Sequence, residues 1–151
     1  KLRLFTENNT IDADTIAAAV TDSARYDVFG LVDRALEGDI RGSLRILHGL
    51  KAEGNEPLAL LWAISRELRT LSNCAEQLAQ GNGIDRVLQS QRVWDKRKPL
   101  TKSALQRLKP QQLRQLIQLA SRIDQTAKGM IKDNSWILLE QLVAKMAGAP
   151  L

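Results

Sequence analysis

The strongest periodic pattern in the chain lies in residues 57–80, PLALLWAISRELRTLSNCAEQLAQ. Apolar side chains recur there at spacings of three and four residues, which places them on one face of a helix. The members of this stripe are Leu61, Ile64, Leu68, Leu71, Ala75 and Leu78. Pro57 suits the first helical position, where its missing N–H leaves no hydrogen bond unmade. The pattern therefore predicts a long core helix from Pro57 to about Gln80, ended by Gly81.

Two shorter helices are predicted on the N-terminal side of this core helix. Asp27 can cap a helix that runs to about Glu37, and Gly38 then supplies the left-handed residue that favours a helix end. Asp39 can cap the next helix, which stops near residues 53–55. The side chains expected to face inward are Val28, Leu31, Val32, Ala35, Leu36, Ile40, Leu44, Leu47 and Leu50. With only Gly38 and Asp39 between them, the two helices are expected to form an antiparallel hairpin.

The C-terminal half continues as helices. Residues 84–90 are expected to form one or two turns, and residues 91–100 to be basic and irregular. Thr101 is predicted to cap a helix through Leu108, and Pro110 to open a helix to about Lys128. Ser135 is predicted to cap a last helix through Ala147. The last helix is apolar on most sides, so we expect it to lie centrally. With no pair of strands in the pattern, the prediction is an all-α bundle of about six to eight helices.

Composition excludes several classes of protein. The 151 residues contain only nine Gly and four Pro, too few for a turn-rich all-β fold. No apolar run approaches the roughly 18–20 residues that a membrane-spanning helix needs. A single Cys permits no internal disulfide and fits a reducing, cytoplasmic compartment. The chain also lacks the GxxxxGK[ST] loop that cradles nucleotide phosphates. We therefore expect no cofactor, no catalytic residue and no membrane partner.

Isolated reactive side chains have ordinary structural interpretations. His48 lies on a helix without a neighbouring Ser or Cys, so a partly exposed helical histidine is expected. Cys74 falls one position from the apolar stripe and is interpreted as a buried or half-buried thiol. One His and one Cys cannot form a His/Cys metal site unaided. Trp62 and Trp136 lie inside apolar helical runs and are predicted to pack in the core.

The formal net charge of +5 is concentrated in one segment. Residues 86–114 carry nine Lys or Arg and a single acid, Asp95. A concentrated positive field attracts polyanions, and an exposed aromatic ring among cations provides a stacking platform for bases. Trp94 could instead anchor the loop to the core while the cations are solvated, and the pattern leaves both interpretations open. The candidate DNA-binding residues are Arg92, Trp94, Lys96, Arg97, Lys98 and Lys102.

Several stretches resemble a known family. Residues 22–39, DSARYDVFGLVDRALEGD, and residues 43–62, SLRILHGLKAEGNEPLALLW, are similar to delta subunits of the bacterial DNA polymerase III clamp loader, in particular the proteobacterial ones. Arg92-Val93-Trp94, residues 112–115 and Ser135-Trp136 fit the same pattern. The resemblance covers nearly the whole chain, and its EGxEPLxLLW run is specific.

The resemblance implies a fragment of a longer subunit. Residues 1–22 would be the tail of a lid-like second domain, and residues 23–151 a helical collar domain. The collar would assemble with gamma/tau and delta-prime to load the sliding clamp on primed DNA. Contact with the clamp itself would be made by a first domain that this chain lacks. The alternative is a stand-alone helical nucleic-acid-binding module that acts through residues 86–114.

The resemblance also implies a role without catalysis in this chain. Delta subunits hydrolyse no ATP, so this chain would be a non-enzymatic part of a DNA-directed DNA polymerase holoenzyme, which belongs to the nucleotidyltransferase class. Its expected place is the bacterial cytoplasm, at the replisome near the nucleoid. Contact between DNA and the basic segment would be secondary to assembly.

Overall fold

The computed structural model describes residues 28–130 and 132–150, and its regular elements in those ranges are all helices. The predicted all-α class is confirmed. Asp27 and residues 1–22 lie outside the described residues. The first helix is described over residues 28–37. The elements that follow are α2 (Ile40–Ala52), α3 (Pro57–Ala79), α4 (Ile84–Ser90), the 3-10 turn η1 (Asp95–Arg97), α5 (Lys98–Arg107), α6 (Pro110–Ala127) and α7 (Ser135–Met146).

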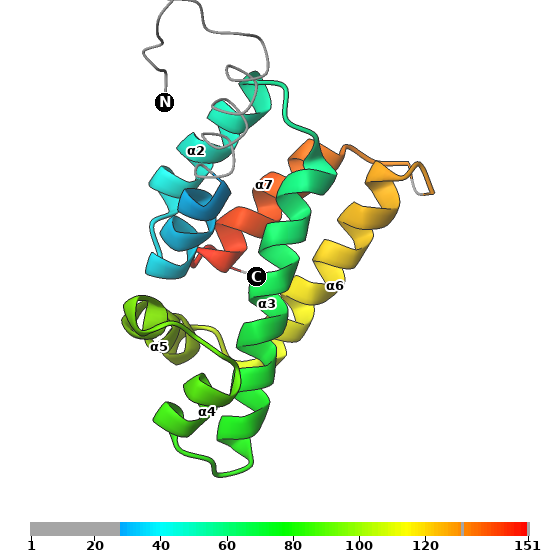
Figure 1. The fold of residues 1–151 in the computed structure, drawn as a ribbon. Coiled ribbons are helices and arrows are strands. Elements are labelled where there is room, and N and C mark those ends of the chain that lie inside the picture. The colour runs from blue at the N-terminus through cyan, green and yellow to red at the C-terminus, as the bar shows by residue number, and fades with distance from the viewer. Residues whose placement is uncertain (1–27, 131, 151) are drawn as a thin grey trace, which may run out of the picture.

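Helix α3 is the axis of the bundle. It packs along α6 and also contacts α4, α5 and α7 (Figure 1). Helix α7 contacts α2, α3 and α6, which confirms the central position expected from its apolar surface. Helix α4 lies at the C-terminal end of α3, and α5 lies between α4 and the turn that joins the first helix to α2 (Figure 1). The described residues therefore form a main part built from the first helix, α2, α3, α6 and α7, and a smaller extension, with α4, around one end of α3.

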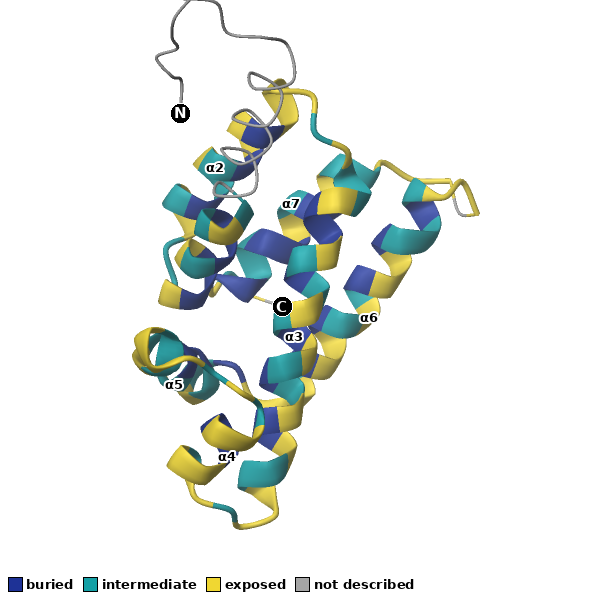
Figure 2. Ribbon diagram, in the orientation of Figure 1, coloured by how far each residue is buried: buried dark blue, intermediate teal, exposed yellow. Residues whose placement is uncertain are grey.

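Leucine dominates the main core. Figure 2 shows that the buried residues gather where α2, α3, α6 and α7 face one another. The inward stripe predicted for α3 is buried from Leu61 to Ala75, and Leu78 is partly buried. Leu60 and Leu138, which lie off the main stripes, are buried as well, so the core is wider than a single stripe. Ile40, predicted to face inward, is instead exposed at the first position of α2.

A small second cluster holds the extension together. Cys74 of α3 is buried against Val87 and Leu88 of α4. Leu78, Ile84, Val93 and Leu105 pack around these three residues. The predicted buried thiol is confirmed, and its role is to join α3 to α4. Burial of this apolar surface fixes the start of the basic segment, because Val93 belongs to the cluster.

Most predicted helix ends are confirmed. Asp39 accepts a hydrogen bond from the Gly42 N–H at 2.9 Å, and Pro57 begins α3. Gly38 and Gly81 have φ values of +87° and +96°, the left-handed conformation that glycine adopts without strain.

Two predicted caps are wrong. The cap of α7 is Asn134, whose side chain accepts from the N–H groups of Trp136 and Ile137, and Ser135 is the first helical residue. Thr101 is not a cap but lies inside α5, 1% exposed, because that helix already begins at Lys98. Pro99 occupies the first turn of α5, where its ring favours an early start. Residues 91–100 are accordingly more regular than predicted.

The three tryptophans differ from the prediction in one case. Trp136 is half-buried and packs against the core, with Lys51 Nζ 5.7 Å from its ring centroid. Trp62 was predicted to be a core residue, and this is wrong, because it is 77% exposed. Leu60 and Leu61 turn inward, so Trp62 falls on the outer face of α3. An apolar run in sequence thus includes one position that points to solvent.

Candidate nucleic-acid interface and docking surface

The segment around Trp94 is fixed to the rest of the domain by residues before and after Trp94 in the sequence. Val93 packs in the small cluster, and its N–H donates to the Leu88 carbonyl at 3.0 Å. Arg92 has φ 58°, an unusual conformation for a residue with a side chain, and it turns the chain at the end of α4. Trp94 itself is 76% exposed and opens the 3-10 turn η1. The indole therefore does not anchor the loop.

Arg97 supplies the second anchor. Its guanidinium donates to Asp33 of the first helix and, at 3.0 Å, to Glu67 of α3. Burial raises the pKa of Glu67 above its ordinary value, although the charge of Arg97 acts in the opposite direction. Arg97 thus ties the basic segment to two helices that are distant in sequence. This use of a cation was not visible in the sequence, where Arg97 was one of five basic DNA-binding candidates.

The other candidates are spread over the surface of the same segment. Lys98 Nζ lies 2.9 Å from Asp95, and Lys102 Nζ lies 3.3 Å from Asp85. Both acids are almost fully exposed, and exposed pairs of this kind contribute little to stability. Arg92 and Lys96 are exposed and form no ion pair with the described residues. These four cations remain available to an anionic partner.

Arg107 is a basic residue with a structural role. It donates to the carbonyls of Ala35 and Leu36 at 3.1 and 3.0 Å, at the end of the first helix. It also donates to the Met146 carbonyl at 2.9 Å, at the end of α7. Carbonyls at helix C-termini lack intrahelical partners, so a cation there satisfies them. Burial lowers the pKa of Arg107.

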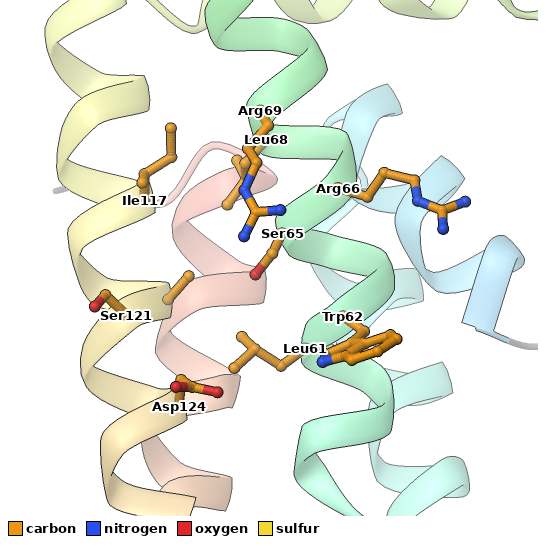
Figure 3. A pocket seen from close by; sticks show the side chains of 10 residues that line it. Leu61, Trp62, Ser65, Arg66, Leu68, Arg69, Ile117, Ser121 and Asp124 are labelled. Carbon is orange, nitrogen blue, oxygen red and sulfur yellow. The ribbon is translucent and has the colours of Figure 1, made fainter.

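A pocket of about 500 Å³ opens between α3 and α6 (Figure 3). Its apolar surface comes from Leu61, Leu68, Ile117 and Ala120. The exposed Trp62 lies at the edge of the pocket. The rest of the pocket is lined by polar and charged side chains of the two helices, namely Ser65, Arg66, Arg69, Ser121 and Asp124. This pocket could not be predicted from the sequence, because its residues come from two helices about 50 residues apart in the chain.

The remaining reactive side chains have structural surroundings. His48 Nε2 lies 2.7 Å from Glu140 Oε2 on the surface, in agreement with the partly exposed histidine predicted. Burial, followed by the charge of Glu67, raises the pKa of Cys74 to about 11. Within residues 28–130 and 132–150, no three His, Cys, Asp or Glu side chains are grouped to hold a metal. None of the described helices is both long enough and apolar enough to span a membrane.

The described residues define an all-helical domain with two exposed tryptophans, Trp94 and Trp62, on separate elements, each with exposed cations close by in sequence. Residues 28–151 match the family model described as "Processivity clamp loader gamma complex DNA pol III C-term". This match covers every described helix, and the chain belongs to that family of clamp-loader C-terminal domains.

Curated relatives agree with the family match. The chain is 34% identical over 151 residues to DNA polymerase III subunit delta of Escherichia coli strain K12, covering 100% of this chain and 44% of that protein. It is 30% identical over 153 residues to DNA polymerase III subunit delta of Haemophilus influenzae Rd, covering 96% of this chain and 44% of that protein. The chain thus spans less than half the length of these relatives.

A solved structure shares the fold. The DNA clamp loader delta protein of Bacillus subtilis superposes with a TM-score of 0.64 at 21% sequence identity. The match covers 90% of this chain and 40% of that chain. At this level of identity, the likeness concerns the arrangement of the helices alone.

Proposed function

We propose that this chain is the collar domain of a clamp-loader delta subunit. In this proposal residues 23–151 form the collar, and residues 1–22 are the end of a lid-like domain. The collar joins gamma/tau and delta-prime, so that a sliding clamp is loaded on primed DNA in the bacterial cytoplasm. The chain contributes docking surfaces and no catalysis to the polymerase holoenzyme. The observation that carries the proposal is the family match over residues 28–151.

Reconstitution tests the assembly role. The full-length protein is mixed with gamma/tau and delta-prime from the same organism. Native mass spectrometry should then record one complex that contains all the subunits. If circular dichroism shows that the protein is folded and it still forms no complex with either partner, the collar proposal is wrong.

A secondary part of the proposal is contact between the Trp94 segment and DNA. The indole is 76% exposed, and four cations within eight residues of it in sequence form no buried ion pair: Arg92, Lys96, Lys98 and Lys102. We assign Arg97 to positioning this segment, because both Asp33 and Glu67 already bind its guanidinium. Because Val93 and Arg97 already fix the backbone on either side of Trp94, stacking of a base on the indole should cost little conformational entropy.

Substitution of the two exposed tryptophans tests the DNA contact. Trp94→Ala should weaken binding of primed DNA by about 1–3 kcal/mol, the usual stacking contribution. Trp62→Ala is the matched control, because that ring is equally exposed on a different helix. If four cations contact phosphates, the logarithm of the binding constant should fall with the logarithm of salt concentration with a slope of about −3 to −4. A slope near zero, or equal losses for the two variants, would contradict the contact.

A further inference from the structure

The outer face of α3 carries an unusual set of side chains. Trp62, Arg66 and Arg69 are spaced by four and three residues, which aligns them on one side of the helix. All three are exposed. Figure 3 shows the Arg69 side chain lying over the pocket beside Ser65, while Trp62 and Arg66 extend from the same outer face of α3 at the edge of the pocket. We call these three residues, with the pocket between α3 and α6, the α3 surface.

The described residues provide no ion-pair partner for the two arginines of this surface, Arg66 and Arg69. Glu67, their neighbour in sequence, turns the other way and binds Arg97. Asp124 at the far side of the pocket is held by Lys128 at 3.1 Å. Two guanidinium groups and a large aromatic ring are therefore presented to solvent together.

We propose that the α3 surface docks an acidic segment of a neighbouring clamp-loader subunit. Carboxylates of that segment would pair with Arg66 and Arg69, since a guanidinium fork binds a carboxylate through two parallel hydrogen bonds. An apolar side chain beside them would enter the pocket and cover Trp62. Tryptophan and arginine are the residues most enriched among those that dominate binding energy at protein interfaces. The inference rests on the proposed collar function and names the surface and the chemistry of its partner.

Protein fits this surface better than nucleic acid does. The pocket has four apolar lining residues, which suit aliphatic side chains and not phosphate groups. The cations predicted to meet DNA lie elsewhere, from the end of α4 into the first turns of α5. The two aromatic patches of the domain thus differ in the partner that their surroundings favour.

Hydroxyl-radical footprinting tests the proposal, because the chain offers two tryptophans of equal exposure. Trp62 and Trp94 are 77% and 76% exposed, so their oxidation rates in the free protein should be similar. The protein in its full length is labelled alone, with gamma/tau and delta-prime, and with primed DNA alone. We expect the subunits to reduce oxidation of Trp62 at least fivefold, and DNA alone to leave it unchanged.

Each other footprint contradicts the proposal in a distinct way. If the complex assembles and Trp62 still oxidises at the free rate, the α3 surface is not an interface, while the collar function stands. If DNA alone protects Trp62, the surface is a nucleic-acid site. If no complex forms, the collar function and the docking inference fail together.

Charge substitution tests the acidic character of the partner. The double variant Arg66→Glu, Arg69→Glu should weaken assembly by roughly thirtyfold in titrations of the complex. The control is Arg66→Lys with Arg69→Lys, which retains both charges and should lose less affinity. Circular dichroism checks that both variants fold. Equal affinity of the two folded variants would overturn the acidic partner even where Trp62 is protected.

Discussion

Replacing Arg97 with Met should destabilise the domain through the two carboxylates that it leaves behind. Methionine keeps much of the aliphatic volume and removes the guanidinium, so Asp33 and Glu67 lose their shared partner. The Glu67 side chain is only 16% exposed, whereas that of Asp33 is 40% exposed. Most of the penalty therefore comes from Glu67, which water reaches poorly.

The expected loss is about 2 kcal/mol. A hydrogen bond to a charged group contributes about 1.5–3 kcal/mol, and breaking a fully buried pair costs about 3–5 kcal/mol. The Arg97 side chain is 31% exposed, so screening by solvent reduces these figures. In urea unfolding of the 151-residue chain, a loss of this size lowers the midpoint by about 1 M.

The loss should depend on pH in a defined direction. Burial raises the pKa of Glu67 above its ordinary value of 4.5, so the folded protein binds this proton more tightly than the unfolded chain. The ionised Glu67 therefore costs stability as the pH rises through that range, and Arg97 reduces the cost. Without Arg97 the pKa of Glu67 rises further. The destabilisation by Arg97→Met should be complete at neutral pH and shrink as the pH falls toward 4.5.

A double-mutant cycle decides whether this reasoning holds. Glu67→Gln removes the charge and keeps the shape, so Arg97→Met should cost distinctly less in that background than in the natural sequence. Urea unfolding followed by circular dichroism measures all four proteins at neutral pH and near pH 5. Additive losses at neutral pH, or a loss that does not change with pH, would refute the role given to Glu67.

Three further outcomes follow from single contacts. Arg107→Ala should cost about 2 kcal/mol in urea unfolding, because the Leu36 and Met146 carbonyls lose their donor, while the Ala35 carbonyl keeps the Gly38 N–H. The exposed Arg114→Ala should cost under about 0.5 kcal/mol. Gly38→Ala should lower the free energy of unfolding by about 1–2 kcal/mol, because Gly38 has a φ of +87°. Gly49→Ala, inside α2 with open space around it, should raise the free energy of unfolding by about 0.5–1 kcal/mol. The reverse order of the two variants would contradict the backbone argument. Cys74, with a raised pKa of about 11, should react with a thiol reagent only as the protein unfolds, and rapid labelling of the native protein would disprove its burial.

The helices could be predicted from the sequence because their signals are local. Periodic leucines place α3 and α6, Asp39 and Gly38 mark helix ends, and the prolines at helix starts confirm them. The position of Trp62 was not predictable in this way, because a residue beside an apolar stripe is buried or exposed according to what packs on that flank. Only the arrangement of α3 against α6 and α7 leaves the flank open.

The basic segment illustrates the same limit for charge. Nine cations in 29 residues indicated a positive field that would attract polyanions, yet the structure turns Arg97 and Arg107 inward to bind partners contributed by the first helix, α3 and α7. A charge count cannot separate these two from Lys96, since an inward cation is defined by acceptors distant in sequence. Trp94 is the informative residue of the segment. Val93 and Arg97 already fasten the chain on either side, so folding gains nothing from an exposed indole between them. Its place in the sequence therefore calls for an explanation outside the fold, and a partner that covers the ring supplies one.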